Sequence, residues 1–243
     1  MQAVILAAGR GTRMVELTTK VPKPMLEVEG KPLLEYKFEA LPEEIDEVII
    51  IVGYLGEVIQ KHFAGSYIGK HIRYVEQKDL NGTAGALWCA KDILSAGGGS
   101  ASGGKDRFLV MMGDDIYTRE NAEECIAPGN VWRLLVQQLP EMYRAGNVEL
   151  GEDGSIAAIV EGDQRTAPGL ASTNMFLLDT RLFTAPMVAK QAGSLELGLP
   201  QTVLAASKEL GIRFEPVFTD KWIQITSPKD LVRTAEVLKK LKK

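Results

Sequence analysis

The chain has 243 residues, a length that suits one large domain or two small ones. Its hydrophobic content of 45% and charged content of 25% are those of an ordinary globular protein and exclude a disordered or fibrous one. The net charge of -4 disfavours nucleic acid as a partner, because nucleic-acid-binding surfaces gather an excess of Lys and Arg. No apolar stretch reaches the roughly 20 residues of a membrane span. The first apolar run lacks the basic flank of a signal peptide, so we expect a cytoplasmic protein with no membrane partner.

Alternating signals for strands and helices run through the first half of the chain. Val4–Ala8 is a continuous apolar run that ends at a glycine, which is typical of a strand buried on both faces in a parallel sheet. Pro32 begins a predicted helix that extends to Leu41, and Glu47–Val52 is a second predicted buried strand. The alternation continues with a helix over Gly53–Phe63, a strand over Ile72–Val75, and a helix over Thr83–Leu94 that the Thr83 hydroxyl is expected to cap. This pattern predicts an α/β fold with a largely parallel sheet.

The middle of the chain carries a small-residue segment and then another strand. Residues 95–104 are all Gly, Ser or Ala, and we interpret them as a flexible surface loop inserted into one domain, not as a domain boundary. Arg107–Met112 is a predicted strand whose carboxyl end delivers Gly113–Asp115 to the edge of the sheet. Because ligands bind at the carboxyl ends of parallel strands, this edge is a candidate site.

The second half of the chain predicts additional strands and a closing helix. Alternating apolar residues favour strands over Trp132–Gln137, Asn147–Leu150 and Ile156–Glu161, which would extend the sheet over the pocket. The spacing over Trp132–Pro140 also fits a helix, and this alternative stays open. Asp230–Leu241 is a predicted amphipathic helix whose final lysines complement the helix dipole.

A glycine-rich loop follows the first predicted strand. Gly9 and Gly11 have no side chain to clash, so the amides around them can approach a phosphate closely. A simple tight turn would give the same pattern. Neither a P-loop nor a Rossmann fingerprint fits, since Met14 stands where the latter needs a glycine. Two cations follow the glycines, Arg13 and then Lys23 in a proline-stiffened segment, and together they could neutralise a triphosphate during phosphoryl transfer.

Several segments together resemble the sugar-1-phosphate nucleotidylyltransferase family. They are Ala3–Met14, Pro22–Leu26, Gly30–Tyr36, Gln77 with Gly82–Leu87, and the Gly113–Asp114 step. The likeness covers essentially the whole chain and is most specific up to Asp114. It implies a Rossmann-like, three-layer αβα fold of the GT-A type, with a mostly parallel mixed sheet and a small added β-sheet over the pocket. It also implies a single domain over 1–243, with a nucleotide-binding half over about 1–128 and a sugar-binding half over about 129–243.

The resemblance assigns most of the nucleotide site to the first half of the chain. The nucleotide-binding residues that it implies are Leu6, Ala7, Ala8, Gly9, Gly11, Thr12, Arg13, Lys23, Gln77, Gly82 and Thr83. Gly11, Thr12 and Arg13 would hold the phosphates, and Lys23 would lie at the α-phosphate. The base and ribose would be held by Leu6, Ala8, Gly9, Gly82 and Thr83. Gln77 carries both an amide donor and an acceptor, which suits the imide edge of uracil or thymine and favours UTP or dTTP. An isolated glutamine after a strand is also commonly just a solvated polar residue.

The resemblance also implies a magnesium site. Asp114 follows a predicted strand end, where it would bind Mg²⁺ together with phosphate oxygens and water. The family's second metal ligand falls at Gln224, a neutral amide in place of a carboxylate, so we expect a weaker or substrate-completed site. Asp115 is interpreted as a turn residue and not as a ligand. Cys89 and Cys125 have no CxxC spacing and are expected to be core residues.

Three residues of the second half occupy the places of the family's sugar contacts. They are Gly146, Glu161 and Asn174. The lysine that would neutralise the acceptor phosphate is absent, because a glycine follows Glu161, and Lys221 or Arg165 could supply that cation instead. Asn174 stands where the family often has a small glycine, so the acceptor could be unusual.

The activity that the resemblance implies is Mg²⁺-dependent transfer of a nucleotidyl group from UTP or dTTP to a sugar-1-phosphate, with release of pyrophosphate. Arg13, Lys23 and Asp114 would be the catalytic residues, acting by positioning and charge neutralisation. Two other functions stay open: a nucleotide or nucleotide-sugar sensor that has lost turnover, and a cytidylyltransferase that acts on a phosphorylated alcohol. The sugar, the pathway and the formation of a homo-oligomer are not specified by the sequence.

Overall fold

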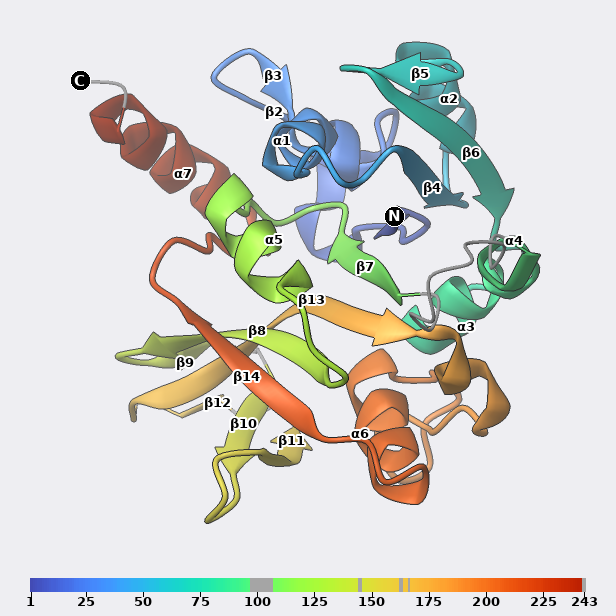
Figure 1. Ribbon diagram of the computed structural model, residues 1–243. Coiled ribbons are helices and arrows are strands. Elements are labelled where there is room, and N and C mark those ends of the chain that lie inside the picture. Colours follow the sequence, from blue (N-terminus) through green and yellow to red (C-terminus); the bar gives the residue numbers. More distant parts are fainter. Residues whose placement is uncertain (97–106, 144–145, 162–163, 166, 242–243) are drawn as a thin grey trace.

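The computed structural model describes residues 1–96, 107–143, 146–161, 164–165 and 167–241 (Figure 1). Within these ranges, ten strands form one mixed sheet. Its main path runs through β11 (Ile156–Val160), β10 (Asn147–Leu150), β13 (Gly169–Asp179), β7 (Arg107–Met112), β1 (Gln2–Leu6), β4 (Glu47–Val52), β6 (Lys70–Glu76) and β5 (Ser66–Tyr67). The other two strands, β8 (Trp132–Leu139) and β14 (Phe214–Thr219), join this path through β13. The architecture is the α/β fold that the sequence predicts.

The centre of the sheet is parallel, and its second half is mixed. β7, β1, β4 and β6 run parallel to one another, whereas β13 runs antiparallel to β7. The segment from Trp132 to Leu139 is a strand and not the alternative helix, because it pairs with both β13 and β14. A small separate sheet pairs β9 (Met142–Tyr143) with β12 (Gln164–Arg165), and a short hairpin pairs β2 (Glu27–Val28) with β3 (Lys31–Pro32). The added strands mostly extend the main sheet.

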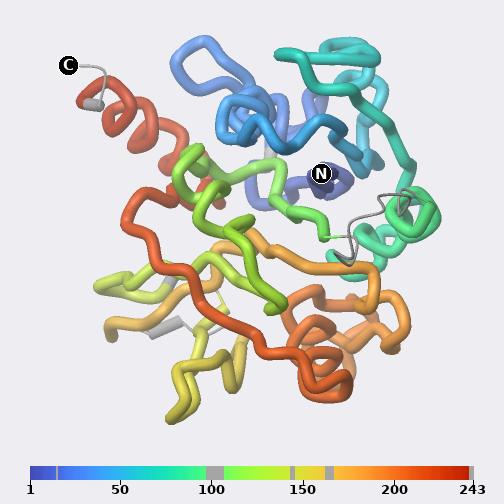
Figure 2. Tube along the Cα trace, in the orientation of Figure 1, coloured from blue at the N-terminus to red at the C-terminus, as the bar shows by residue number. Residues whose placement is uncertain are grey.

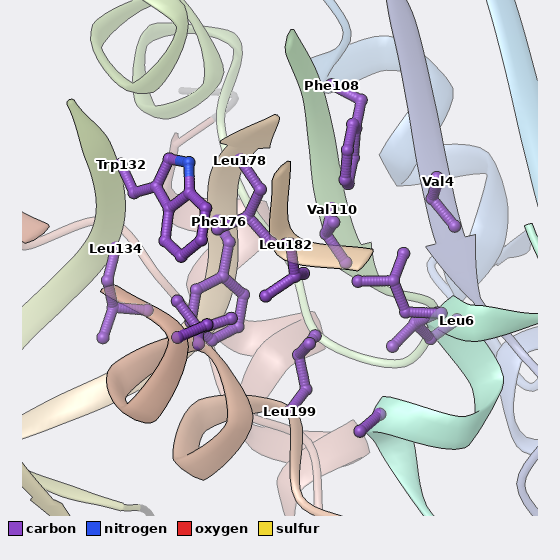
Figure 3. Packing of buried hydrophobic residues seen from close by; sticks show 14 of the residues in the cluster. Val4, Leu6, Phe108, Val110, Trp132, Leu134, Phe176, Leu178, Leu182 and Leu199 are labelled. Carbon is purple, nitrogen blue, oxygen red and sulfur yellow. The ribbon is translucent and has the colours of Figure 1, made fainter. Parts of the chain in front are cut away.

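Side chains alternate between the two faces of the buried β1 strand and produce a three-layer arrangement. Val4 and Leu6 face a core that α3 (Thr83–Trp88), α4 (Lys91–Ala96) and α6 (Leu199–Glu209) cover (Figure 3). Ala3 and Ile5 face a second core that α1 (Leu33–Ala40), α2 (Gly56–Phe63) and α5 (Arg119–Ile126) cover. Both faces of β1 are therefore buried, which explains why its residues read as a continuous apolar run.

The closing helix, α7 (Pro228–Leu241), lies at the periphery, while the first strand runs through the interior (Figures 1 and 2). Leu231, Ala235 and Leu238 of α7 pack on a small third core that includes Met14 and Leu26. This contact fixes the C-terminal segment against the loop that follows β1. In the described residues, every helix is too short or too polar to span a bilayer.

Two predicted helices differ from the structure by more than a shift of one or two end residues. The second helix begins at Gly56 and not at Gly53, because Leu55 has a left-handed φ of 52° and so cannot belong to the helix. The predicted helix over Thr83–Leu94 is two helices, and Ser95 belongs to the end of the second. The Thr83 hydroxyl does not cap its own helix but accepts a hydrogen bond from the Leu199 amide, in the first turn of α6, at 3.0 Å. Residues 97–104 of the predicted loop lie outside the described residues.

The carboxyl ends of the parallel strands meet at one edge of the sheet. Leu6 pairs with Ile51 and Met112, and Val52 pairs with Glu76, so these strands end side by side. The segments that follow them, which begin at Ala7, Gly53, Gln77 and Gly113, therefore lie together. This edge is where the sequence predicts the ligand site.

Candidate active site

The loop after β1 exposes backbone amides that have no partner in the protein. In the described part of the chain, the amides of Gly9, Gly11, Thr12 and Arg13 donate to no protein acceptor, whereas the Ala7 amide still donates to Ile51 at 2.9 Å. A short 3₁₀ helix, η1 (Thr12–Thr18), follows, and its first-turn amides point away from its own carbonyls. Such a set of amides can bind an anion, as a phosphate cradle requires.

The two glycines of the loop serve different purposes. Gly11 has φ of 62°, and a Cβ atom there would lie 2.8 Å from the Cβ of Lys23, so glycine lets the Lys23 stem pass close to the loop. A Cβ atom on Gly9 would meet no protein atom within 4 Å. Gly9 therefore borders open space, which belongs to the two cavities described next.

Two adjoining cavities lie over the sheet edge. The first, of about 420 Å³, contains most of the expected phosphate, metal and sugar residues, and the second, of about 680 Å³, contains the expected base-binding residues. Both are lined by Leu6, Gly9, Gly11, Thr12, Thr83, Met112, Lys190 and Glu196. The first also includes Ala7, Arg13, Lys23, Asp114, Glu161, Asn174 and Gln224, and the second also includes Ala8, Gln77 and Gly82. The cradle thus lies where the two cavities meet.

The wall of the second cavity is rigidly built around Gln77. The Gln77 side-chain amide donates to the Asn81 Oδ1 and to the Gly82 carbonyl, both at 3.1 Å. A Cβ atom on Gly82, which has φ of 108°, would lie 2.4 Å from the carbonyl oxygen of Leu197, so only glycine fits there. Both amide hydrogens of Gln77 are used within the protein, which leaves its carbonyl oxygen to face a ligand. Of the donor and the acceptor expected from Gln77, only the acceptor lacks a partner among the described residues of this structure.

Lys23 joins the phosphate loop to the metal candidate. Its Nζ atom lies 2.5 Å from Asp114 Oδ2 and also donates to the carbonyl of Ile225. Lys23 is the first, buried residue of a short helix, η2 (Lys23–Met25), and the prolines on either side of it, Pro22 and Pro24, limit its backbone conformations. A fixed ammonium group therefore faces the cavity beside a carboxylate.

Asp115 is buried at the end of β7 and bonds to a distant segment of the chain, whereas the sequence predicts a turn residue. Its two carboxylate oxygens accept from the Ile225 amide at 3.1 Å and from the Trp222 indole N–H at 3.2 Å. Burial, with the adjacent Asp114 charge, raises the pKa of Asp115 to about 7. These bonds hold the segment that contains Gln224 against the end of β7.

The pKa of Asp115 makes stability depend on pH. The ordinary pKa is 3.8, and the folded value is about 7, so between these values the folded chain holds a proton that the unfolded chain has released. The stabilisation is complete below pH 3.8 and is lost as pH rises to about 7. We expect the unfolding free energy of the wild type, relative to that of Asp115→Asn, to fall by at most about 1.4 kcal/mol per pH unit in this window. Urea denaturation at several pH values measures it, and a pH-independent difference would contradict the assignment.

A second lysine, Lys37 on α1, is fully buried close to the two aspartates. Its Nζ atom donates to the Leu33 carbonyl at 3.3 Å and lies 5.5 Å from the centroid of the Tyr117 ring. Burial lowers the pKa of Lys37 to about 8, and the charges of Asp115 and Asp114 oppose that change. The lysine offsets part of the negative charge at the site. Sequence reasoning missed it, since a lysine in an amphipathic helix usually faces water.

The candidate metal ligands fit magnesium as an incomplete site. Asp114 lines the first cavity with a carboxylate that is partly exposed, and Gln224 lines it with a neutral carbonyl. Asp115 also lines this cavity, but its two oxygens accept hydrogen bonds that hold the Trp222–Ile225 segment, so its position is explained without a metal. No cluster of three acidic, cysteine or histidine side chains within the described ranges could enclose a metal ion. Because Mg²⁺ commonly uses one or two carboxylates with phosphate oxygens and water, this donor set is sufficient only with a bound phosphate.

Two of the three expected sugar residues line the first cavity, and the third, Gly146, lies behind one of them. Glu161 and Asn174 line the cavity. A Cβ atom on Gly146 would lie 3.1 Å from Glu161 Oε1, so the absence of a side chain at Gly146 leaves room for the Glu161 carboxylate. Asn174 adopts φ of 59° at an irregularity in β13, a conformation that asparagine tolerates better than most residues. Burial raises the pKa of Glu161, and Lys190 opposes the rise.

Of the two cations that the sequence offers for the acceptor phosphate, the structure places only Lys221. Lys221 is exposed and pairs with Glu120, outside both cavities. The side chain of Arg165 and the residue after Glu161 lie outside the described residues. Lys190 lines both cavities instead. It follows no recognisable motif, and only the folding of its segment over the sheet edge brings it to the site.

Comparison with known proteins agrees with this geometry. Residues 2–240 match the model of the nucleotidyl transferase family. The chain belongs to this family. It is 27% identical over 242 residues to UTP–glucose-1-phosphate uridylyltransferase AglF of Haloferax volcanii, covering 95% of this chain and 93% of that protein. It is 29% identical over 231 residues to D-glycero-alpha-D-manno-heptose 1-phosphate guanylyltransferase of Campylobacter jejuni, covering 95% and 96%. The chain spans about half the length of several other curated relatives that it matches.

Solved structures of this nucleotidyl transferase's relatives share its fold. A candidate glucose-1-phosphate thymidylyltransferase of Bacillus anthracis, determined with a sucrose, superposes with a TM-score of 0.79 at 23% identity, covering 98% of this chain and 95% of that one. The likeness extends across the sheet and its flanking helices. The fold class and the family inferred from sequence are therefore confirmed.

Proposed function

We propose that this nucleotidyl transferase moves a nucleotidyl group from a nucleoside triphosphate to the phosphate of a sugar-1-phosphate, with release of pyrophosphate, and that a single domain over 1–243 does so. The observation that carries the proposal is the meeting of unpartnered loop amides, Arg13, Lys23 and Asp114 at one cavity that continues into the wall of Glu161 and Asn174. The names of the relatives support the acceptor class, since each acts on a sugar-1-phosphate.

The residues divide the work of an in-line displacement. An oxygen of the acceptor phosphate would attack the α-phosphorus, and the bond to the pyrophosphate oxygen would break, so no covalent enzyme intermediate is needed. The amides of Gly11 and Thr12 with Arg13 would hold the leaving pyrophosphate, and Lys23 would neutralise the α-phosphate. Preorganised charges of this kind supply most of the acceleration in such reactions.

Gln77 would select the base through its free carbonyl oxygen. That oxygen accepts from a ring N–H, which uracil, thymine and guanine present on their pairing edge and cytosine and adenine do not. UTP and dTTP remain the proposed donors, and GTP is the next candidate. The relatives named above include both a uridylyltransferase and a guanylyltransferase.

Mg²⁺ held by Asp114 and Gln224 would supply additional charge neutralisation at the α-phosphate. Because Gln224 is neutral, we expect Gln224→Asp to lower the Mg²⁺ concentration for half-maximal activity by about tenfold. Gln60→Asp is the control, since it adds the same charge on an exposed face of α2. Titration of activity with Mg²⁺ measures the effect. An equal change in both variants would show that Gln224 has no part in metal binding.

The direct test is pyrophosphate release from each of the five common nucleoside triphosphates with a panel of hexose 1-phosphates. We expect release only when both substrates are present, with UTP, dTTP or GTP as the donor. No release from any pair would overturn the proposal.

A sensor is the second candidate function, and the neutral Gln224 is the observation that favours it. Tight nucleotide binding by calorimetry, with no release even from Gln224→Asp, would support the sensor.

A further inference from the structure

A hairpin opposite the phosphate loop forms the wall shared by the two cavities. Ala189 and Leu197 pair across it, the Lys190 amide donates to the Glu196 carbonyl at 2.8 Å, and the Gly198 amide donates to the Val188 carbonyl at 2.9 Å. The hairpin is fastened to the base-binding segment, because the Leu197 amide donates to the Asn81 carbonyl at 2.6 Å. It continues directly into α6. The backbone of the hairpin is therefore held in place beside the cavities.

Lys190 is the cation that this hairpin presents. Arg13 and Lys23 lie on the opposite side, and Lys23 is already bonded to Asp114. Lys190 pairs with Glu196 at 3.4 Å, but the Glu196 side chain is 61% exposed, so the pair is weak and can be exchanged for a stronger anion. Its charge also acts on Glu161 across the first cavity. The Lys190 ammonium group, close to the expected sugar-binding residue Glu161, could pair with the phosphate of the acceptor.

Gln201, in the first turn of α6, places a carboxamide in the same wall. Both polar atoms are shielded from solvent and make no hydrogen bond to the described protein residues, although the amide lies near enough to Glu161 to oppose the rise in its pKa. A buried amide that has no well-formed hydrogen bond costs free energy, so a ligand hydroxyl that bonds to it would be favoured. Gln201 lines the first cavity, where such a hydroxyl would lie.

One glycine makes room for both side chains. A Cβ atom on Gly198 would lie 1.9 Å from Gln201 Oε1 and 3.0 Å from the Cα of Lys190. Its φ of -88° suits any residue, so the requirement for glycine is purely steric. The packing at Gly198 thus couples the position of the hairpin to that of the Gln201 carboxamide.

We propose that Lys190 and Gln201 recognise the acceptor, Lys190 by pairing with its phosphate and Gln201 by hydrogen bonding to a sugar hydroxyl. This inference rests on the proposed function and names the residues that select the acceptor. Lys190 would supply the cation for which the sequence offers Lys221 and Arg165 as candidates. Gln201 is a polar contact that no motif in the sequence indicates.

Initial-rate kinetics test the role of Lys190, with UTP and the hexose 1-phosphate that the wild type uses best. Lys190→Ala should raise the KM for the acceptor by about 10- to 100-fold and leave the KM for UTP within about twofold, since it removes one charge-assisted contact. Lys190→Arg should recover most of the loss because it keeps the charge. Gln191→Ala, at an exposed position of the same hairpin, should change neither constant.

Deoxy analogues of the acceptor test Gln201. In the wild type, removal of the contacted hydroxyl should raise the KM, whereas Gln201→Met should use the parent acceptor and that analogue equally well. Three results would overturn the inference: an unchanged acceptor KM in Lys190→Ala, a rise in KM confined to UTP, or a loss with the deoxy analogue that persists in Gln201→Met. Pyrophosphate release by the wild type would in that case still support the proposed function. A wild type that releases no pyrophosphate would overturn both.

Discussion

Gly9→Val should abolish nucleotide binding and leave the folded chain intact. The Cβ of the new side chain meets no protein atom within 4 Å, and the backbone at this position is not in the left-handed region, so no strain is expected. The valine would instead fill the space over the sheet edge where the phosphates are proposed to lie. We expect UTP affinity to fall by at least about 100-fold, because a steric block removes several charge-assisted hydrogen bonds at once. The unfolding free energy should change by about 0.5 kcal/mol or less.

Gly65→Val is the matched control for this substitution. Gly65 likewise has nothing within 4 Å of an added Cβ and no left-handed φ, but it follows α2 and lines neither cavity. It should bind UTP like the wild type. Calorimetric titration and urea denaturation of both variants give the two quantities. Normal UTP binding by Gly9→Val would show that the phosphates lie elsewhere.

Lys23→Met should remove most of the activity and part of the stability. The methionine keeps the length of the stem that passes Gly11 but loses the charge that pairs with Asp114 at 2.5 Å and bonds to Ile225. We expect kcat/KM to fall by about 10²- to 10³-fold, as when one preorganised charge is removed from a transition state. The unfolding free energy should fall by up to about 3 kcal/mol, because the Asp114 carboxylate, with a side chain only 26% exposed, loses its partner.

Lys31→Met is the control for Lys23→Met, since it shows what the loss of an ion pair costs at a place outside the proposed site. Lys31 also lies 2.5 Å from a carboxylate, that of Glu39, but the pair is more exposed and lies outside both cavities. It should cost about 1 kcal/mol or less and leave kcat/KM unchanged. Steady-state kinetics and urea denaturation decide the matter. Equal losses of activity in the two variants would remove Lys23 from the proposed chemistry.

The parts of the fold that the sequence predicts best are the buried strands. Glu47–Val52 and Arg107–Met112 were predicted with the bounds that the structure has, because burial on both faces requires an uninterrupted apolar run. The predicted helix over Thr83–Leu94 was too long, since propensity does not reveal a break at Cys89 and Ala90. The Thr83 hydroxyl bonds to α6, more than a hundred residues away, and local patterns contain no such information.

The candidate site was predictable where one short segment contains its chemistry. The glycine-rich loop, Lys23 and Asp114 line the expected cavity, although their roles remain proposals. Lys190 and Lys37 were missed for a different reason. Each is an ordinary lysine in its local sequence, and only tertiary packing brings Lys190 to the cavity and buries Lys37 near Asp115.

Amide hydrogen exchange measured by NMR, with and without UTP, tests the central claim most directly. The amides of Gly9, Gly11, Thr12 and Arg13 have no acceptor in the described protein, so they should exchange rapidly in the free chain. With UTP bound, we expect their exchange to slow by at least about tenfold, because the phosphate oxygens become their acceptors. Unchanged exchange at these four amides in a chain saturated with UTP would contradict the account.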